Sequence, residues 1–242
     1  NIALWRRLSG RAPMNPLWTF GFNQSRERYV SQQQLVDVVR RYRELGIPLD
    51  GIVQDWQYWG TDFENWNAVE WRNPEFPDPR RMIDEVHALN AHVMVSIWPS
   101  FGPWTAPHKE LAANGLLLPS ETFPQNKGVR AYDPFSPLAR EIYWKHIKKN
   151  MFDIGMDSWW LDATEPEHGP VSPSDYDHMT ACGTFRQVRN AYPLVTVGGV
   201  YDAQRAECSS KRVMILTRSA FAGQQRYGAH SWSGDIVAGW DV

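Results

Sequence analysis

Two aspartates stand where they could act on the same substrate. Asp162 ends a short apolar run rich in tryptophan, residues 158–161, so a buried strand would place its carboxylate at the rim of a core. Asp235 follows Gly234 near Trp232, on a different predicted element. Retaining glycoside hydrolysis uses two carboxyl groups about 5–5.5 Å apart, of which one attacks the sugar and the other protonates the leaving oxygen. The pair therefore suggests glycoside hydrolysis, if the fold brings both residues together.

The two roles require opposite surroundings. An apolar neighbour such as Trp232 would raise the pKa of Asp235 toward that of a proton donor. Asp162 must instead stay ionised, in a polar setting where a nearby cation holds its pKa down. Arg218, at the end of a predicted strand, is the candidate cation and would also hold a sugar hydroxyl. The alternative for each acid is an ordinary helix N-cap or loop position.

A metal site is a second interpretation of the residues around Asp162. Glu165, Glu167 and His168 crowd together with it, and all four side chains are of types that bind metals. Pro166 prevents a regular helix from aligning them, and no distant pair of histidines offers further ligands. We therefore expect neither a metal nor an organic cofactor.

Composition excludes several classes of partner. The 242 residues suffice for one large α/β domain or two small ones, and 43% apolar residues is ordinary for a globular protein. A net charge of −2 gives no basic footprint for nucleic acid, and no apolar run approaches the roughly 20 residues that cross a bilayer. The 13 tryptophans are the outlier, and their flat apolar faces with an N–H at the edge suit carbohydrate rings. We expect neither nucleic acid nor a membrane as partner.

Short apolar runs alternate with longer helical patterns along the chain. Because the runs are apolar on both faces, they predict parallel strands joined by right-handed helical crossovers. The predicted strands are residues 17–22, 51–56, 91–98, 158–162, 194–197 and 212–218, with 229–232 as a seventh candidate. The predicted helices are residues 31–45, 79–89, 137–152, one within 175–192, and 201–208.

The positions of the polar residues favour a barrel over an open doubly wound sheet. Asp55, Asp162 and Arg218 all fall at carboxyl ends of predicted strands, where barrel enzymes place their active sites. The first strand lacks the glycine-rich fingerprint of a dinucleotide fold. The predicted fold class is therefore an α/β (β/α)8 TIM barrel, incomplete at six to seven of its eight strands. Such a barrel would expose core edges, so we expect the isolated segment to be inactive.

Several segments, in order, resemble glycoside hydrolase family 31. Residues 160–165, Trp-Leu-Asp-Ala-Thr-Glu, resemble its nucleophile motif, and residues 216–227 resemble the segment that leads to the acid/base. Residues 232–235, Trp-Ser-Gly-Asp, match the acid/base motif. Residues 8–11 and 16–22 resemble the approach to the first barrel strand of the family.

The resemblance implies a catalytic barrel segment over residues 1–242, without the flanking β-sandwich domains of the family. Asp162 would be the nucleophile and Asp235 the acid/base, while Asp55 would bind the distal hydroxyls of the sugar and Arg218 would be the substrate-binding arginine. Alanine and threonine stand at positions 163 and 164, where many α-glucosidases of the family have Met and Asn. The expected substrate-binding residues are Asp55, Trp56, Trp98, Trp160, Arg218 and Trp232.

The sugar is expected to be xylose. A xylosyl unit lacks the C6 hydroxymethyl group, so a bulky wall of Trp56 and Trp98 would exclude glucose, unless these residues are ordinary rim packing. Residues 55–59 resemble the matching segment of bacterial xyloglucan-directed α-xylosidases. The loop of residues 61–71, with Trp66 and Trp71, would stack on the aglycone or cover the barrel mouth.

The sequence thus predicts an α-xylosidase that removes non-reducing-end xylosyl residues from xylo-oligosaccharides or xyloglucan oligosaccharides by double displacement. One alternative is an α-glucosidase or α-transglucosylase of the same family. Another is a catalytically inactive carbohydrate-binding homologue. The resemblance favours a periplasmic or secreted location, and it leaves the oligomeric state open.

Overall fold

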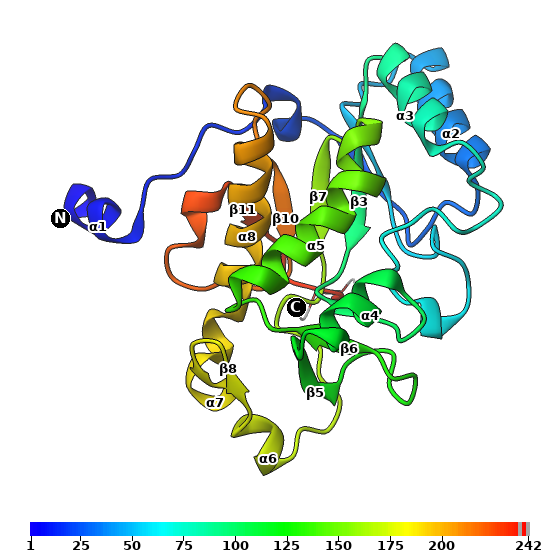
Figure 1. Cartoon of the computed structure of the whole chain (residues 1–242). Coiled ribbons are helices and arrows are strands. Elements are labelled where there is room, and N and C mark those ends of the chain that lie inside the picture. The colour runs from blue at the N-terminus through cyan, green and yellow to red at the C-terminus, as the bar shows by residue number, and fades with distance from the viewer. Residues whose placement is uncertain (237–238, 241–242) are drawn as a thin grey trace.

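Six parallel strands form the central sheet of this computed structural model, which describes residues 1–236 and 239–240. The strands lie side by side in chain order, β1-β2-β3-β7-β10-β11 (Figure 1). Within the described residues the sheet stays open, with β1 and β11 at its edges, as expected for part of a barrel. The strands are β1 (Asn23–Gln24), β2 (Gly51–Gln54), β3 (His92–Ile97), β7 (Ser158–Leu161), β10 (Ile215–Thr217) and β11 (Ala229–Ser231).

Helices cover the convex face of this sheet. In Figure 1, α5 and α8 cross in front of the strands and α2 and α3 lie together at one side, while α1 stands apart from the body. Buried aliphatic and aromatic side chains fill the space between the helices and the sheet. The described α-helices are α1 (Ile2–Ser9), α2 (Gln32–Glu44), α3 (Pro79–Ala88), α4 (Ala106–Ala113), α5 (Pro137–Asn150), α6 (Pro173–Tyr176), α7 (Phe185–Val188) and α8 (Tyr192–Glu207).

Capping residues explain why α2, α3 and α5 begin where predicted. The side chains of Ser31, Asp78 and Ser136 each accept a hydrogen bond from the backbone N–H three residues further on. Proline occupies the first turn of α3 and of α5, where its missing N–H costs no hydrogen bond. The predicted helices at 31–45, 79–89 and 137–152 are therefore confirmed.

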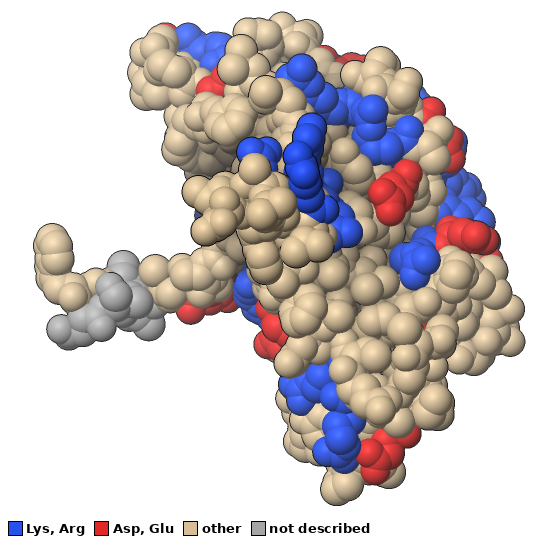
Figure 2. All heavy atoms as spheres, turned by 90° about the vertical axis from the view of Figure 1, so that its left-hand side faces the viewer, with Lys and Arg blue, Asp and Glu red and all other residues tan. Residues whose placement is uncertain are grey.

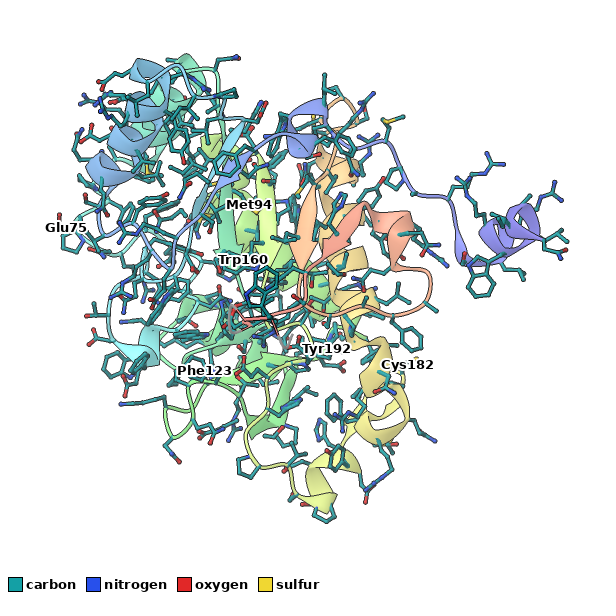
Figure 3. The ribbon with its side chains drawn as sticks, turned by 180° about the vertical axis from the view of Figure 1, so that it is seen from behind. Glu75, Met94, Phe123, Trp160, Cys182 and Tyr192 are labelled. Atoms are coloured by element: carbon teal, nitrogen blue, oxygen red, sulfur yellow. The ribbon has the colours of Figure 1, made fainter. Side chains whose placement is uncertain are left out.

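The opposite, concave face of the sheet carries a smaller apolar cluster. Val53, Met94 and Met214 are buried there, and Trp160 and Leu216 pack against them. Figure 3, a view from behind, shows Met94 and Trp160 on this open face, with no helix of the convex layer in front of them. These side chains point toward the interior that a closed barrel would enclose.

A small antiparallel sheet follows β3 and lies beyond the carboxyl ends of the strands. It consists of β4 (Ser100–Phe101), β6 (Arg130–Tyr132) and β5 (Leu117–Glu121), in that spatial order. The connection between β5 and β6 carries Phe123, whose N–H donates to the carbonyl of Glu167 at 2.9 Å. This hydrogen bond joins the antiparallel sheet to the segment that follows β7.

Two predicted strands are wrong. Residues 17–22 contain the 3₁₀ helix Leu17–Phe20, whose Leu17 and Phe20 are exposed, and the strand begins only at Asn23, which pairs with Gly51. Residues 194–197 belong to α8 instead of a strand. Gly198 in that helix lets it approach η5 (Gln224–Tyr227) closely, since an added Cβ would come within 2.8 Å of the Tyr227 ring.

The helix predicted within residues 175–192 is present only as short pieces. The segment holds two one-turn helices, α6 and α7, on either side of a two-stranded hairpin of β8 (Met179–Thr180) and β9 (Gly183–Thr184). Gly183 has φ of +135°, a conformation that interrupts a helix and that glycine adopts readily. The candidate strand at residues 229–232 is confirmed as β11, so six parallel strands are present in the described part.

The surface is mixed in charge. On the face shown in Figure 2, Lys and Arg side chains lie among Asp and Glu side chains and uncharged residues. This agrees with the small net charge of −2 for the whole chain. In the part of the chain that the structure describes, none of the helices has the length and apolar character needed to span a membrane.

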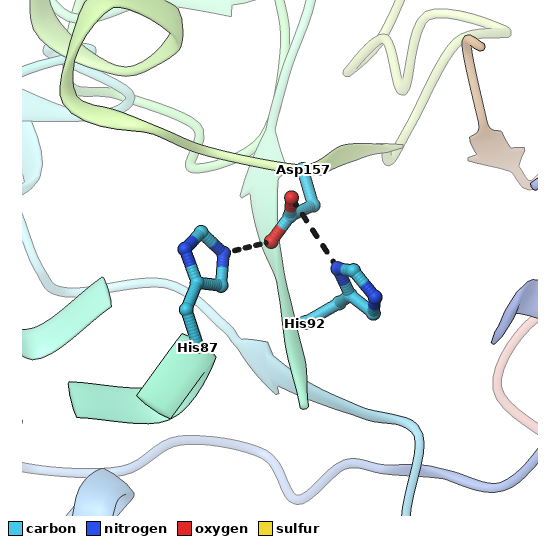
Figure 4. A group of neighbouring side chains, drawn as sticks. All are labelled: His87, His92 and Asp157. Atoms are coloured by element: carbon cyan, nitrogen blue, oxygen red, sulfur yellow. Dashed lines mark hydrogen bonds and ion pairs between the residues drawn. The ribbon is translucent and has the colours of Figure 1, made fainter. Parts of the chain in front are cut away.

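An ion cluster ties the amino ends of β3 and β7 together (Figure 4). The carboxylate of buried Asp157 accepts hydrogen bonds from His87 Nε2 at 2.7 Å and from the N–H of Val93 at 2.9 Å. His92 Nδ1 and Lys211 Nζ lie 3.4 and 3.5 Å from its other oxygen. Burial alone would raise the pKa of Asp157, but these partners together lower it below its ordinary value.

We expect Asp157→Asn to lower the free energy of unfolding by roughly 1–3 kcal/mol at pH 7, because it removes the anion that accepts from the buried Val93 N–H and that the partly exposed His87, His92 and Lys211 surround. The loss should be smaller at pH 3. A lowered pKa contributes stability above the ordinary value of 3.8, and this contribution disappears as the pH falls through the folded-state pKa. Denaturant unfolding followed by tryptophan fluorescence measures the free energy of unfolding at both pH values. The control is Asp153→Asn, which changes an aspartate in the exposed ion pair with Lys148. Equal losses for the two variants would contradict the assignment.

Candidate active site

The register of the sheet brings the predicted site residues to one edge. Ile97 of β3 pairs with Leu161 of β7, and Leu161 pairs with Thr217 of β10. The next residue on each strand is Trp98, Asp162 or Arg218, so these three emerge side by side. Asp55 directly follows β2, which neighbours β3.

A cavity of about 660 Å³ opens at this edge. Seven of the eight predicted site residues line it: Asp55, Trp56, Trp98, Trp160, Asp162, Arg218 and Asp235. The eighth, Trp232, packs edge-on against Trp160 with ring centroids 5.6 Å apart and lines a neighbouring cavity on the concave face. Trp160 borders both cavities.

Asp162 is largely buried, and its surroundings differ from the expectation. Desolvation by burial raises its pKa to about 6, although Arg218 and the N–H of Ala163 oppose the change. The Ala163 N–H donates to Asp162 Oδ1 at 2.8 Å, and Arg218 Nε lies 3.8 Å from the same oxygen. Arg218 acts in the expected direction and lowers this pKa, but the expected polar setting is absent, and burial outweighs the charge of the arginine. The carboxyl group is still mainly ionised at pH 7.

Asp55 has the more strongly raised pKa, about 8. Burial is the main cause, the N–H of Trp56 opposes it by donating to Oδ1 at 2.7 Å, and the charge of Asp162 raises the pKa further. At neutral pH this carboxyl group therefore carries a proton in most molecules. A protonated carboxyl can donate one hydrogen bond and accept another, which suits a pair of sugar hydroxyls.

Arg218 is held by a clamp of two glutamates. Its guanidinium donates to Glu165 with both Nε and Nη2, at 3.1 and 3.0 Å, and to Glu167 Oε2 at 2.6 Å. Desolvation would lower the pKa of this half-buried group, but the glutamates and Asp162 raise it overall. The acids considered as metal ligands in the sequence are thus partners of an arginine, and the clamp orients Arg218 toward the cavity.

Asp235 lies on an exposed segment that reaches the same cavity. Its charge raises the pKa of both Asp162 and Asp55, so its carboxyl group stands near the other two. The apolar enclosure expected from Trp232 is not present, because Asp235 is exposed and Trp232 packs on Trp160 instead.

An aromatic wall closes one side of the cavity. Trp98 contacts Trp66 edge-on at a centroid distance of 4.9 Å, and Phe123 lies against both rings. Trp56 stacks on Phe63 with centroids 6.5 Å apart. Of the two tryptophans expected on the loop 61–71, Trp66 lines the cavity. Trp71 lies outside it, because its indole N–H donates to the Asn150 carbonyl on the helical side.

The comparisons with known proteins agree with this geometry. Residues 12–242 match the glycosyl hydrolases family 31 TIM-barrel domain. The chain belongs to glycoside hydrolase family 31. An α-xylosidase of Saccharolobus solfataricus is 42% identical over 98% of this chain and 31% of its own length. The crystal structure of the family 31 α-xylosidase from Xanthomonas citri superimposes with a TM-score of 0.91 at 41% identity, covering 99% of this chain and 27% of that one.

Two further relatives are less similar to this chain. An α-glucosidase of Saccharolobus solfataricus is 24% identical over 98% of this chain and 38% of its own length. A family 31 α-xylosidase from a soil metagenome, solved with xylose, has a TM-score of 0.86 at 33% identity, over 95% of this chain and 34% of that one. The chain thus spans about a third of the length of these relatives. The family and the barrel fold are shown by these likenesses, and the fold class predicted from the sequence is confirmed.

Several residues of this family 31 cavity were not anticipated. Ser25, Arg26 and Glu27 line it directly after β1, and they were missed because the first strand was placed at 17–22. Their position is equivalent to that of Asp55 after β2, so a correct strand would have indicated them. Phe123 carried no such signal, because it lies on the antiparallel excursion after β3.

Titration of the two buried acids tests this electrostatic arrangement. We expect carboxyl resonances of ¹³C-labelled aspartate to show one group with a pKa near 6 and another near 8, and Asp162→Asn and Asp55→Asn to remove them in turn. Because the charge of Asp162 raises the pKa of Asp55, Asp162→Asn should also lower the pKa of Asp55. An Asp55 pKa that does not respond would contradict the proximity of the two groups. The distant Asp202→Asn is the control.

Proposed function

We propose that this chain carries the catalytic residues of a retaining glycosidase that releases α-linked xylose from the non-reducing ends of xylo-oligosaccharides or xyloglucan oligosaccharides. The observation that carries the proposal is the convergence of Asp162, Asp235, Asp55 and Arg218 on one cavity at the carboxyl ends of parallel strands. The sugar is taken from the relatives, since the three α-xylosidases compared are 33–42% identical to this chain and the α-glucosidase is 24% identical.

In the proposed mechanism, Asp162 attacks the anomeric carbon while Asp235 protonates the departing oxygen. A covalent glycosyl-enzyme forms, and water then attacks it with Asp235 acting as base. Burial desolvates the Asp162 carboxylate, so its negative charge is stabilised by few groups before attack. Arg218 lies 3.8 Å from Asp162 and keeps it ionised at neutral pH despite this burial.

Asp55 and Arg218 would bind the sugar in this scheme. The raised pKa of Asp55 makes it a hydrogen-bond donor at neutral pH, and it lines the cavity directly after β2. Arg218 keeps a fixed orientation because the glutamate clamp leaves it little freedom. We propose no cofactor, since attack and protonation use side chains of this chain alone.

We further propose that Trp56 and Trp98 exclude the C6 hydroxymethyl group of glucose. Trp98 is buried and held by Trp66 and Phe123, so it cannot move aside easily. Trp56 is fixed on one face by Phe63 and contacts the guanidinium of Arg28 at 5.1 Å. Rigid walls are what steric exclusion requires, because a mobile ring would let the larger sugar in.

The second candidate is an α-glucosidase or α-transglucosylase, which the 24% identical relative represents. Hydrolysis and transglycosylation share the glycosyl-enzyme, so product analysis at high acceptor concentration would distinguish them. An inactive carbohydrate-binding homologue is the candidate from another class. It accounts less well for a buried carboxylate with a raised pKa beside an oriented arginine, which are features of reactive sites.

Replacing the two proposed catalytic acids should give different defects. In the complete protein, Asp162→Ala should abolish release of nitrophenol from an aryl α-xyloside. Asp235→Ala should slow it by about 10²–10⁴-fold, the usual contribution of acid–base catalysis. Azide should then restore turnover of Asp235→Ala and yield an α-xylosyl azide, whereas any azide product of Asp162→Ala would be the β-anomer, because it forms by a single inversion. Retained turnover by Asp162→Ala would sink the nucleophile assignment, with Asp153→Ala as control.

Opening the wall should change the preference between sugars. We expect Trp56→Ala and Trp98→Ala to lower kcat/KM on the aryl α-xyloside and to raise the relative rate on the aryl α-glucoside by about tenfold or more. Trp71→Ala, which changes a tryptophan outside the cavity, should leave the ratio as it is. If the wild-type protein already prefers the α-glucoside, the second candidate function is correct instead.

A further inference from the structure

A strained turn directly follows the proposed nucleophile. Ala163 has φ of +52°, in the left-handed region that L side chains with a Cβ rarely adopt. Its N–H donates to Asp162 Oδ1, so this unusual backbone conformation aims a hydrogen bond at the carboxylate. Residues in such conformations persist only where neighbouring structure enforces them. Something next to Ala163 must therefore hold the turn.

The next residue provides the hold. Thr164 is fully buried, and its hydroxyl lies 2.6 Å from the hydroxyl of Thr217 and 2.6 Å from that of Ser219. Three hydroxyl groups of adjoining segments thus form one short chain. A hydroxyl has one donor and two acceptor positions, so Thr164 can both give and receive. We call Thr164, Thr217 and Ser219 the hydroxyl pin.

The two partners of Thr164 lie on either side of Arg218. Thr217 is the last residue of β10, paired with Leu161, and Ser219 follows the arginine directly. The carbonyl of Ser219 accepts a hydrogen bond at 2.9 Å from the amide of buried Gln224. The pin therefore connects the backbone around Arg218 to the backbone after Asp162, while the Arg218 side chain reaches over to Glu165 and Glu167.

We propose that Thr164, through its hydroxyl bonds to Thr217 and Ser219, is a positioning residue that holds the turn at Ala163 and fixes Asp162 relative to Arg218. The inference rests on the proposed function, because it assigns Asp162 a reactive carboxylate. It adds a device behind the site that touches no substrate. Backbone register alone aligns the strand ends, but it leaves the residues after them free to turn, and the pin removes that freedom.

The electrostatics give the pin a measurable signature. Asp162 is faced by Arg218 from β10, by Glu165 from its own loop, by Asp235 from the C-terminal segment and by Asp55 from β2. Of these groups only Arg218 stabilises the ionised form. A looser turn would let Asp162 move away from the cation while the three acids remain. The pKa of Asp162 would then rise further, and the acid limb of the pH–rate profile would move to higher pH.

The test is Thr164→Val, which keeps the shape of the side chain and removes only the hydroxyl. In the complete protein, we expect kcat on an aryl α-xyloside to fall by about tenfold to a hundredfold, because small displacements of a reacting group cost this much. The acid limb of kcat/KM should move to higher pH. Thr164→Ser restores the hydroxyl and should return both readouts to near the wild-type values.

Two further variants distinguish positioning from a general loss of packing. Thr196→Val removes a buried threonine hydroxyl in α8, away from the cavity, and should leave the acid limb unchanged. Ser219→Ala removes one of the two bonds at a half-buried position and should shift the acid limb less, in the same direction. If Thr164→Val does not fold, the acid limb of Ser219→Ala tests the positioning role instead. An unchanged acid limb in folded Thr164→Val, or in Ser219→Ala in its place, would overturn the proposal.

The activity of the wild-type protein distinguishes a failure of the positioning role of Thr164 from a failure of the proposed glycosidase function. If the wild-type protein turns over neither aryl α-xyloside nor aryl α-glucoside, the proposed function fails. If it is active and Thr164→Val shows the wild-type acid limb, the positioning role fails while the proposed function stands.

Discussion

The parallel register of β3, β7 and β10 is the constraint on which the rest of the molecule depends. Pairing of Ile97 with Leu161 and of Leu161 with Thr217 makes these strands end at one level. The carboxyl ends of parallel strands lie at the same edge of the sheet. The residues that follow the strands are therefore brought together by the sheet itself, without direct contacts between their side chains. A slip of one residue would turn each of these side chains to the other face. The cavity is thus a consequence of backbone hydrogen bonding before it is a property of particular side chains.

Burial and charge compete at this edge, and burial prevails. Both Asp55 and Asp162 have raised pKa values although an arginine stands nearby. Desolvation is the main cause for both groups, and at Asp162 the opposing effect of Arg218 is limited, because the arginine gives its hydrogen bonds to Glu165 and Glu167 and lies 3.8 Å from Asp162. The guanidinium therefore acts on Asp162 through space, with part of its charge already balanced by the clamp. The two glutamates thereby reduce how strongly Arg218 can stabilise the ionised form of the proposed nucleophile.

Much of the site could be predicted from the sequence, because each strand end is marked locally. Asp55, Asp162 and Arg218 are polar residues that end apolar runs, and this pattern needs no tertiary information. The run at residues 194–197 has the same local appearance, yet it is helical because Pro193 lies in the first turn of α8 and Gly198 allows close packing on Tyr227. That outcome depends on contacts between distant segments. The position of Phe123 in the cavity and the glutamate clamp on Arg218 also depend on contacts between distant segments. No residue type or spacing in the sequence indicates either of them.

The strand β7 has a different task at each of its ends. Before it stands Asp157, an anion surrounded by His87, His92 and Lys211, and after it stands Asp162, an anion that burial disfavours. The ion cluster and the cavity share no side chain. The loops around the cavity can therefore change over evolutionary time, altering which sugar fits, while the opposite end keeps the strand in place. Mutations at one end of β7 can therefore change substrate preference without changing the contacts that stabilise the fold at the other end.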